Sequence, residues 1–535
     1  MPVKKQLQRN FKKAPSKNIS RNNIHRPAKN NIKHYTKRRS KAQSLRTQRL
    51  CIAVGLGLIF ILMMQCVIIK QQRNQEKLDT TTEQVQEKMD STETKAKESD
   101  MIFPSDIRVL INAGNYAGTI HKEIQVTSDK PYIVTENGQE TSYPAGEKYS
   151  IVPEQKSLKN GKIFITPTED GKLCVLSITR SYGNPEYRGR LEIEAKEDGL
   201  TLINEVDVES YLYAVVPSEM PVSYGAEALK VQAVCARSFA YNQMKSSNYD
   251  EYGADLEDSV NSQVYNNVKE SPEAIAAVDA TKGQILTYED SIVNTYFFST
   301  SSGHTANSTD VWISDAASPA YLTGHLQAEE EGQLQLAQEE AFQSFIDNAQ
   351  QYAYFEQDYP WFRWNVTTTA KKLKQTIAQN ISSVQDKIKV KNKAGQYVTS
   401  SVQNIGRICD MNVLKRSDSG VMMELEIKGS KHTIKVTGEY AIRKLLGNNQ
   451  IPVNLKDGTT SQLSMLPSGY FYIAKKTNAK GKVSSFTFYG GGFGHGVGMS
   501  QNGVKAMADK GYTFEQMLSH YYAGTELSIV QHDNP

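Results

Sequence analysis

Hydrophobic positions form one long uninterrupted run near the start of the chain and many short alternating or helical runs after it. The long run, residues 50–69, contains a single polar member, Gln65, and twenty such residues span the hydrocarbon core of a bilayer. Residues 1–49 hold sixteen Lys and Arg and no Asp or Glu. Because positive flanks stay in the cytoplasm, the pattern predicts one N-terminal transmembrane helix in the cell membrane, with a cytoplasmic N-terminus and the remaining chain outside.

A cleaved signal peptide is the alternative interpretation of the same run. The basic region and the apolar run are both long for a signal, and no A-x-A-like cleavage site follows them. The basic tail also accounts for the net charge of +4, because the residues after it hold 46 basic against 58 acidic side chains. The acidic part beyond the tail repels nucleic acid, so no nucleic-acid partner is expected there. The basic tail is expected to be attracted to anionic lipids of the inner leaflet.

The pattern beyond the apolar run changes twice. Residues 70–104 are rich in Lys, Glu, Thr and Gln, which predicts a solvated spacer. Over 105–185 short alternating apolar runs are broken by Gly, Pro, Asn and Asp, which predicts a small all-β unit. Over 186–530 strands and helices mix without regular alternation, so the expected fold class is α+β. Whether 326–484 forms a separate lobe stays open.

Apolar spacing within 186–530 predicts individual elements. A helix is expected at 226–244, with Ser223 as its N-cap. The other expected elements are strands at 187–216, 285–298, 402–436 and 483–488, and helices at 329–350, 369–381, 439–446 and 501–508.

Seven glycines fall within residues 490–503, and glycine lets a backbone approach a ligand closely. Phosphate binding is not predicted, because G-x-G-x-x-G is absent and Val504 stands where the Walker pattern needs Lys. A tight turn with several positive φ angles is one alternative. A bare groove that admits an extended polymer is favoured, with His495 and Gln501 as polar contacts.

Glu219 stands between Pro217 and Pro221, at an expected strand-to-helix junction. The two prolines fix the local backbone, and a general acid needs such rigid placement. Apolar neighbours on both sides would raise the pKa of its carboxyl group. Composition alone favours the alternative, an ordinary acidic residue near a helix N-terminus.

Cysteines give little support for a disulfide framework. Only Cys174, Cys235 and Cys409 lie beyond residue 69, and none belongs to a C-x-x-C pattern. Cys235 lies in an Ala-rich helical pattern and is expected to be a small buried residue.

Three separated motifs resemble the SpoIID/LytB family. VPSEMP belongs to the first, at 208–240; STSSGHT begins the second, at 299–312; and GGGFGHGVGMSQNG begins the third, at 490–525. They occur in the family's order, and the likeness covers about 187–530. The expected fold is therefore a SpoIID-type catalytic unit preceded by the small β unit.

The resemblance implies a lytic transglycosylase that cuts peptidoglycan strands stripped of stem peptides, beside a cell-wall amidase, in spore formation or cell-wall remodelling. The family's catalytic glutamate matches Glu219, which would protonate the glycosidic oxygen and then accept the proton of the sugar's 6-hydroxyl group. One carboxyl group suffices, in contrast to hydrolysis by two. The expected substrate contacts are Arg237, Ser301, His304, Gly492, His495 and Gln501, although Arg237 by itself suggests an ion pair.

Some relatives hold zinc through His and Cys near the STSSGHT-like loop. This chain has no Cys between 236 and 408, and Phe298 stands where His is frequent, so neither a metal nor another cofactor is expected. LytB-type relatives imply an alternative function, in which the chain binds glycan and stimulates an amidase without cutting. Residues 105–185 would then be a docking module. A purely structural envelope protein is a third interpretation.

Overall fold

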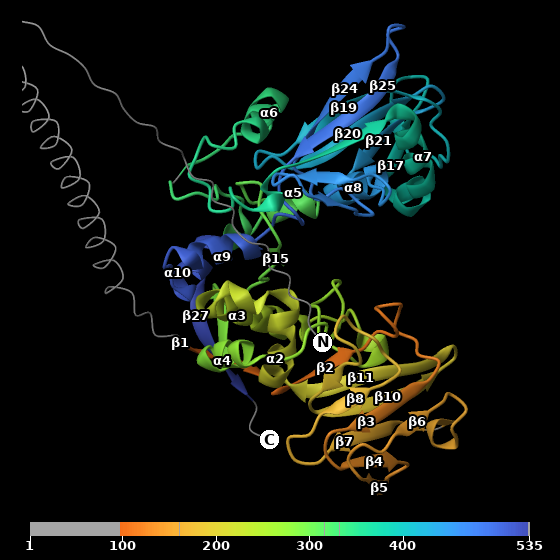
Figure 1. Cartoon of the computed structure of the whole chain (residues 1–535), viewed down its shortest axis with the longest axis vertical. Helices are drawn as coiled ribbons and strands as arrows, with labels where there is room; N and C mark the ends of the chain where they lie inside the picture. Colours follow the sequence, from red (N-terminus) through yellow and green to blue (C-terminus); the bar gives the residue numbers. More distant parts are fainter. Residues whose placement is uncertain (1–96, 160, 315, 331, 533–535) are drawn as a thin grey trace, which may run out of the picture. The chain divides into compact units, whose positions relative to one another are not determined.

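The computed structural model describes residues 97–532 apart from 160, 315 and 331 (Figure 1). The basic tail, the predicted anchor at 50–69 and most of the predicted spacer lie outside the described residues. Within 97–532, with the same gaps, no helix is long and apolar enough to cross a membrane. Strands and helices mix along the described chain, in agreement with the predicted α+β class.

Two sheets dominate the N-terminal part of the described chain. In the larger sheet β7 pairs antiparallel with β10, and Ile165 lies opposite Leu191. Its strand order is β12 (Leu256–Glu257), β2 (Asp106–Leu110), β11 (Gly199–Asp207), β10 (Arg190–Lys196), β7 (Ile163–Pro167), β4 (Tyr132–Glu136) and β5 (Gln139–Tyr143). The smaller sheet has the order β6 (Tyr149–Ile151), β3 (Ile124–Ser128), β8 (Leu173–Val175) and β9 (Glu186–Tyr187). Strands from both sides of the predicted boundary at 185 therefore share one sheet.

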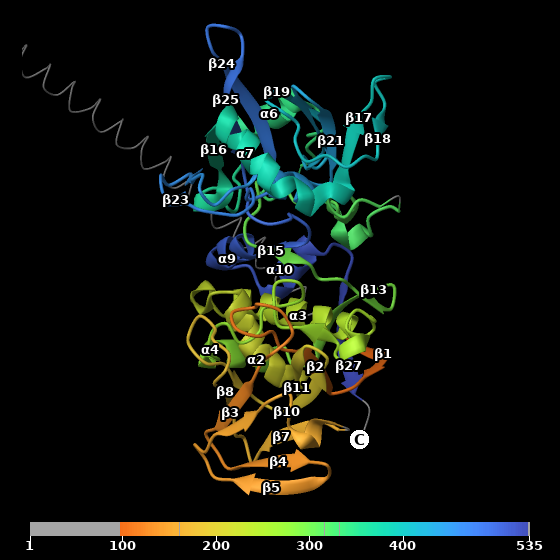
Figure 2. The ribbon, with the colours of Figure 1, turned by 90° about the vertical axis from the view of Figure 1, so that its right-hand side faces the viewer.

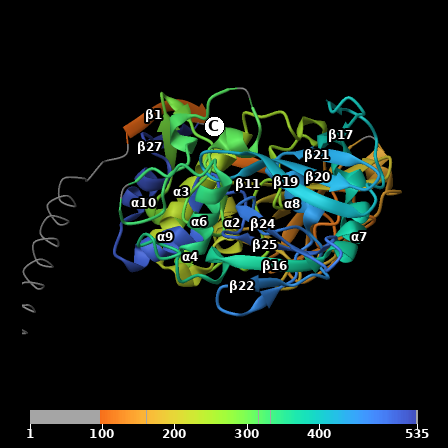
Figure 3. The ribbon, with the colours of Figure 1, turned by 90° about the horizontal axis from the view of Figure 1, so that it is seen from above.

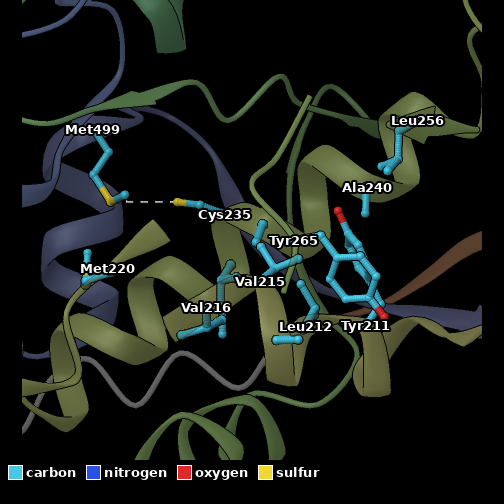
Figure 4. Close-up of a cluster of buried hydrophobic side chains, with 14 of the residues drawn as sticks. Tyr211, Leu212, Val215, Val216, Met220, Cys235, Ala240, Leu256, Tyr265 and Met499 are labelled. Atoms are coloured by element: carbon cyan, nitrogen blue, oxygen red, sulfur yellow. Dashed lines mark hydrogen bonds between the residues drawn. The ribbon is translucent and has the colours of Figure 1, made fainter. Parts of the chain in front are cut away.

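A group of helices follows these strands: α2 (Val208–Glu219), α3 (Ala226–Gln243) and α4 (Pro272–Ala280). Side chains all round α3 are buried, and its Cys235 Sγ lies 4.0 Å from Met499 Sδ (Figure 4). The expected strand at 187–216 is wrong beyond residue 207, where α2 begins. Because α2 is buried on most sides, its β-branched and aromatic residues imitate a strand in sequence. The N-cap of α3 is Gly225 and not Ser223.

The first and last described strands are neighbours. Strand β1 (Lys97–Phe103) runs parallel to β27 (Glu526–His532), which also pairs with β13 (Gln284–Tyr288) (Figure 3). Beyond β13, β14 (Ser291–Ile292) completes this sheet. The two-stranded pair β15 (Phe297–Phe298) and β26 (Met499–Ser500) precedes α9 (Gln501–Asp509) and α10 (Phe514–Tyr521).

Residues 364–490, here named the second lobe, include most of the elements at the top of Figure 2. They contain a hydrophobic cluster of their own. Its helices α7 (Ala370–Asn380) and α8 (Glu439–Leu446) agree with the sequence prediction. One of its sheets has the order β23 (Thr460–Ser461), β22 (Val453–Leu455), β16 (Trp364–Thr369), β25 (Val483–Gly490) and β24 (Phe471–Thr477). The other has the order β18 (Tyr397–Val398), β17 (Ile388–Lys391), β21 (Thr433–Thr437), β20 (Met422–Gly429) and β19 (Ile408–Arg416).

One predicted helix is much shorter than expected. Among the described residues of 329–350, only α6 (Glu339–Asp347) is helical. The acidic and glutamine-rich stretch before α6 favours a helix by composition, but few of its side chains are buried to stabilise one. The predicted domain boundaries stay predictions.

Candidate active site

Glu219 is the last residue of α2, and its backbone is fixed on both sides. Asp207 caps the start of this helix by accepting a hydrogen bond from Ser210 N at 3.0 Å. Pro217 lies in the last turn, and the helix stops because Met220 adopts an extended conformation. A short 3₁₀ turn (Val222–Tyr224) and α3 follow, so Glu219 ends a helix and does not lie at the expected strand-to-helix junction.

The carboxyl group of Glu219 has few protein partners. Its Oε1 accepts a hydrogen bond from Val264 N at 2.6 Å, which is its one hydrogen bond within the described residues. Burial raises the pKa of Glu219 to about 7, and the bond from Val264 opposes this shift only partly. A carboxyl group with this pKa is protonated in a large fraction of molecules at neutral pH and can donate that proton.

Glu219 lines a cavity of about 590 Å³. Aromatic side chains make much of its wall, namely Phe239, Tyr296, Phe297, Phe298 and Trp312. Its polar lining comes from Asn261, Ser262, Thr295, Ser299, His495 and Gln501. An apolar wall with a few convergent polar groups and a perturbed carboxyl group is typical of a ligand site.

His495 lines this cavity as a neutral side chain. Its ring lies 5.3 Å from Trp312 and 5.6 Å from Phe298, measured between centroids. Burial, assisted by the charge of Arg443, lowers the pKa of His495 to about 4. Because Nδ1 accepts from Val497 N at 3.1 Å, Nε2 carries the proton and is a hydrogen-bond donor.

Gln501 connects the end of the glycine-rich segment to the end of α2. It is the first residue of α9, whose N-cap is Ser500. Its Nε2 donates to the carbonyl oxygen of Glu219 at 2.9 Å and lies 3.3 Å from Gln232 Oε1. The structure thus brings Glu219, His495 and Gln501 to one cavity.

Comparison with known proteins finds a matching family model and several relatives. A family model described as stage II sporulation protein (SpoIID) matches residues 196–288, which include Glu219, and a domain of unknown function matches 306–498. The amidase enhancer of Bacillus subtilis (strain 168) is 26% identical over 428 residues, covering 75% of this chain and 55% of that protein. Stage II sporulation protein D is 26% identical over 342 residues in B. subtilis (strain 168) and 27% over 343 in Bacillus amyloliquefaciens. Each of these two matches covers 61% of this chain, and they cover 76% and 75% of the respective relative.

These matches support the SpoIID/LytB family for this chain, and the SpoIID model itself covers residues 196–288. The chain spans little more than half the length of the amidase enhancer that it matches.

Four of the residues expected to contact substrate lie in the packed interior. Arg237 is fully buried, and its guanidinium donates to both carboxylate oxygens of Glu209 at 2.8 and 2.6 Å. His304 is buried as well, with Nδ1 2.7 Å from the carbonyl oxygen of Thr305, and burial lowers its pKa to about 4. Arg237, Ser301, His304 and Gly492 do not line this cavity, and their contact with substrate stays a prediction.

The glycine-rich segment is packed closely and does not form the bare groove that its composition suggested. A Cβ at Gly498 would lie 2.2 Å from the carbonyl oxygen of Tyr296, and one at Gly492 2.9 Å from that of Thr300. Each of the seven glycines at 490–503 has another atom within 3.0 Å of its ideal Cβ position. Only Gly494 among them lines the cavity. The glycines therefore allow neighbouring segments to approach one another.

Glu356 is a residue that sequence reasoning missed. It is fully buried, and its carboxyl group accepts hydrogen bonds from Ser301 N at 2.8 Å, from Ser301 Oγ and from Ser500 Oγ. Through these bonds it fastens the STSSGHT loop to the residue that caps α9, which carries Gln501. A single acid in the aromatic stretch at 352–359 gave no signal of this role.

The loop that supplies Val264 was also missed. It is held by Asp258, which pairs with Arg180 at 2.6 Å while both side chains are fully buried. Asp258 also accepts from Asn112 N and from its side-chain amide. Arg180 and Asn112 belong to the N-terminal β part, so that part supports the loop beside Glu219.

Metal binding was not expected from the sequence. Within the part of the chain that the structure describes, no group of three or more His, Cys, Asp or Glu side chains is arranged to hold a metal ion.

Proposed function

We propose that this chain is a lytic transglycosylase that cleaves peptidoglycan strands stripped of stem peptides. The observation that carries the proposal is Glu219, a rigidly held carboxyl group with a pKa of about 7 on a 590 Å³ cavity. Similarity to the SpoIID family model and to stage II sporulation protein D supports a role at the cell wall. We further propose that residues 50–69 anchor the chain in the membrane, with its folded part outside the cell.

Protonated Glu219 donates its proton to the glycosidic oxygen, and the bond from that oxygen to the anomeric carbon breaks. The resulting carboxylate then accepts the proton of the 6-hydroxyl group as the 6-oxygen bonds to the anomeric carbon. The product is an anhydro sugar, and no water molecule is consumed. The neutral imidazole of His495 and the amide of Gln501 are hydrogen-bonding groups for the sugar beside this bond.

The first test is product analysis with the purified full-length chain. Peptide-free glycan strands are incubated with the wild type and with Glu219→Gln, and anhydro products are measured by mass spectrometry. Loss of the proton donor should lower the rate at least about a hundredfold. Glu340→Gln removes an exposed carboxylate from α6 and should leave the rate unchanged. Full activity in Glu219→Gln, or no anhydro product from the wild type, would contradict the proposal.

A second candidate function follows from the relative named amidase enhancer. In that case the chain binds glycan and stimulates a cell-wall amidase without cutting the strand. Amidase activity is then raised equally by the wild type and by Glu219→Gln, and neither yields anhydro sugars. The two functions are separated by assaying both products in the same reaction.

A further inference from the structure

A second and larger cavity adjoins the candidate active site. Its volume is about 1090 Å³. Val260, Trp312, Gly494 and His495 line both cavities, so the two lie side by side. A polymer that is cut in its interior extends to both sides of the bond that is cleaved. This second cavity is available to one of the two sides.

The far wall of this cavity belongs to the second lobe. It is formed by the 3₁₀ helix Ile381–Lys387 and by α8, with Thr437 and Gly438 before α8. Its polar side chains include Ser383, Asp386 and Lys387. Hydroxyl, carboxylate and ammonium groups spaced along a wall can bond to the hydroxyl and amide groups of a sugar chain.

Exposed apolar side chains gather on the same cavity. Of the eleven large hydrophobic side chains that are exposed within the described residues, four line it: Val260, Trp312, Ile313 and Tyr440. Trp312 is 44% exposed and Tyr440 54%. Single exposed apolar side chains are common on protein surfaces, but several on one cavity are not. Such a set is typical of a binding surface. Aromatic rings also provide flat faces for the C–H side of a sugar ring.

The base of the cavity is rigid and is connected to the candidate active site. Arg443 pairs with Glu439 at 3.1 Å and donates to the carbonyl oxygens of Leu466 and Pro467. Pro467 also accepts from Gly494 N at 3.0 Å, next to His495. The wall from the second lobe is therefore held in place relative to the residues that surround Glu219.

We propose that this second cavity binds the glycan strand beyond the cleavage site, with Trp312 and Tyr440 as stacking platforms. The proposal rests on the proposed function. A peptide is a poorer fit, because this wall consists of helices whose backbone groups are already bonded and which offer no strand edge. A polyanion such as nucleic acid is also disfavoured, because Lys387 faces Asp386 and Arg443 is already paired with Glu439.

Binding is tested without cleavage in the full-length Glu219→Gln chain. The probes are peptide-free glycan strands fractionated by length, and affinity is measured by calorimetry. Adding Tyr440→Ala should weaken binding of long strands about tenfold and leave binding of the disaccharide unchanged. Trp312→Ala should weaken binding of both, since Trp312 lines both cavities. Tyr489→Ala removes a partly exposed tyrosine from β25 that lines neither cavity, and it should change nothing.

The proposal is overturned if Tyr440→Ala binds long strands as Tyr489→Ala does. It is also overturned if Tyr440→Ala weakens only strands that carry stem peptides, since the occupant would then be the peptide. Length-dependent binding that needs Tyr440, without anhydro products from the wild type, leaves the cavity assignment standing and rejects the transglycosylase. Anhydro products from the wild type, with no effect of Tyr440→Ala on binding, support the transglycosylase and reject the cavity assignment.

Discussion

The surroundings of Glu219 and of Glu356 are two ways of burying one carboxyl group. Glu356 is completely enclosed, and hydrogen bonds from two serines occupy both its oxygens. Glu219 accepts one hydrogen bond within the described residues, from Val264 N, and its side chain lines the cavity. Burial raises the pKa of both groups, but only Glu356 has several donors that oppose the shift. A carboxyl group whose oxygens all accept hydrogen bonds, such as that of Glu356, is suited to hold segments together. A carboxyl group with one hydrogen bond, such as that of Glu219, is suited to transfer a proton.

The largest change in stability that would test this comparison of two carboxyl groups is expected at Glu356. Glu356→Ala leaves the donors on Ser301 and Ser500 without a partner and should lower the free energy of unfolding by about 4 kcal/mol. Urea denaturation followed by circular dichroism measures this change. Glu340→Ala, on the exposed face of α6, should cost less than about 0.5 kcal/mol. Equal stability of the two variants would mean that Glu356 does not hold the junction together.

The next largest effect is a pH-dependent difference in stability between the wild type and Glu219→Gln. The folded protein binds a proton there between the ordinary pKa of 4.5 and about 7, whereas the unfolded chain has released it. Wild-type stability is therefore lost as pH rises through this window. Glu219→Gln does not titrate, so its advantage over the wild type should grow from near zero below about pH 4.5 to as much as about 3 kcal/mol at about pH 8.

Urea titrations of both proteins at several pH values measure this difference, and Glu340→Gln is the matched control, because its side chain is exposed. A constant difference between the wild type and Glu219→Gln across the window would show that the carboxyl group of Glu219 is not buried as described.

The smallest effect concerns the support of Glu219 by Gln501. Gln501→Ala removes the bond to the carbonyl oxygen of Glu219 and should cost about 1 kcal/mol of stability. It should also lower kcat/KM for glycan cleavage about tenfold, because a displaced acid transfers its proton less well. Gln343→Ala, on the exposed side of α6, should change neither quantity. Unchanged kcat/KM in Gln501→Ala would remove Gln501 from the site.

Part of the candidate site was within reach of the sequence. Glu219 stands out because two prolines flank it and because its motif resembles a family. The helices at 370–380 and 439–446 have the regular spacing of buried residues along one face, which single-sequence reasoning detects. Helix α2 escaped detection because burial on most sides removes that periodicity.

Other parts depend on contacts between distant segments. Glu356 bonds to residues 55 and 144 positions away, so no local pattern announces it. The composition of residues 490–503 predicts a bare groove, but most of the atoms that exclude a Cβ at these glycines belong to other segments, which no local pattern reveals. The ion-pair alternative for Arg237 agrees with the structure. Its partner, Glu209, lies 28 positions earlier, on α2, so the sequence did not identify it.

The parallel pairing of β1 with β27 has a mechanical consequence. Lys97 lies opposite Ser528 and Phe103 opposite His532, so the two strands run side by side in the same direction. Tension applied at Lys97 along the strand would load this ladder in shear, and its hydrogen bonds would resist together instead of opening one after another. With the membrane anchor and the glycan binding proposed above, this ladder would carry the tension between the membrane and the cell wall.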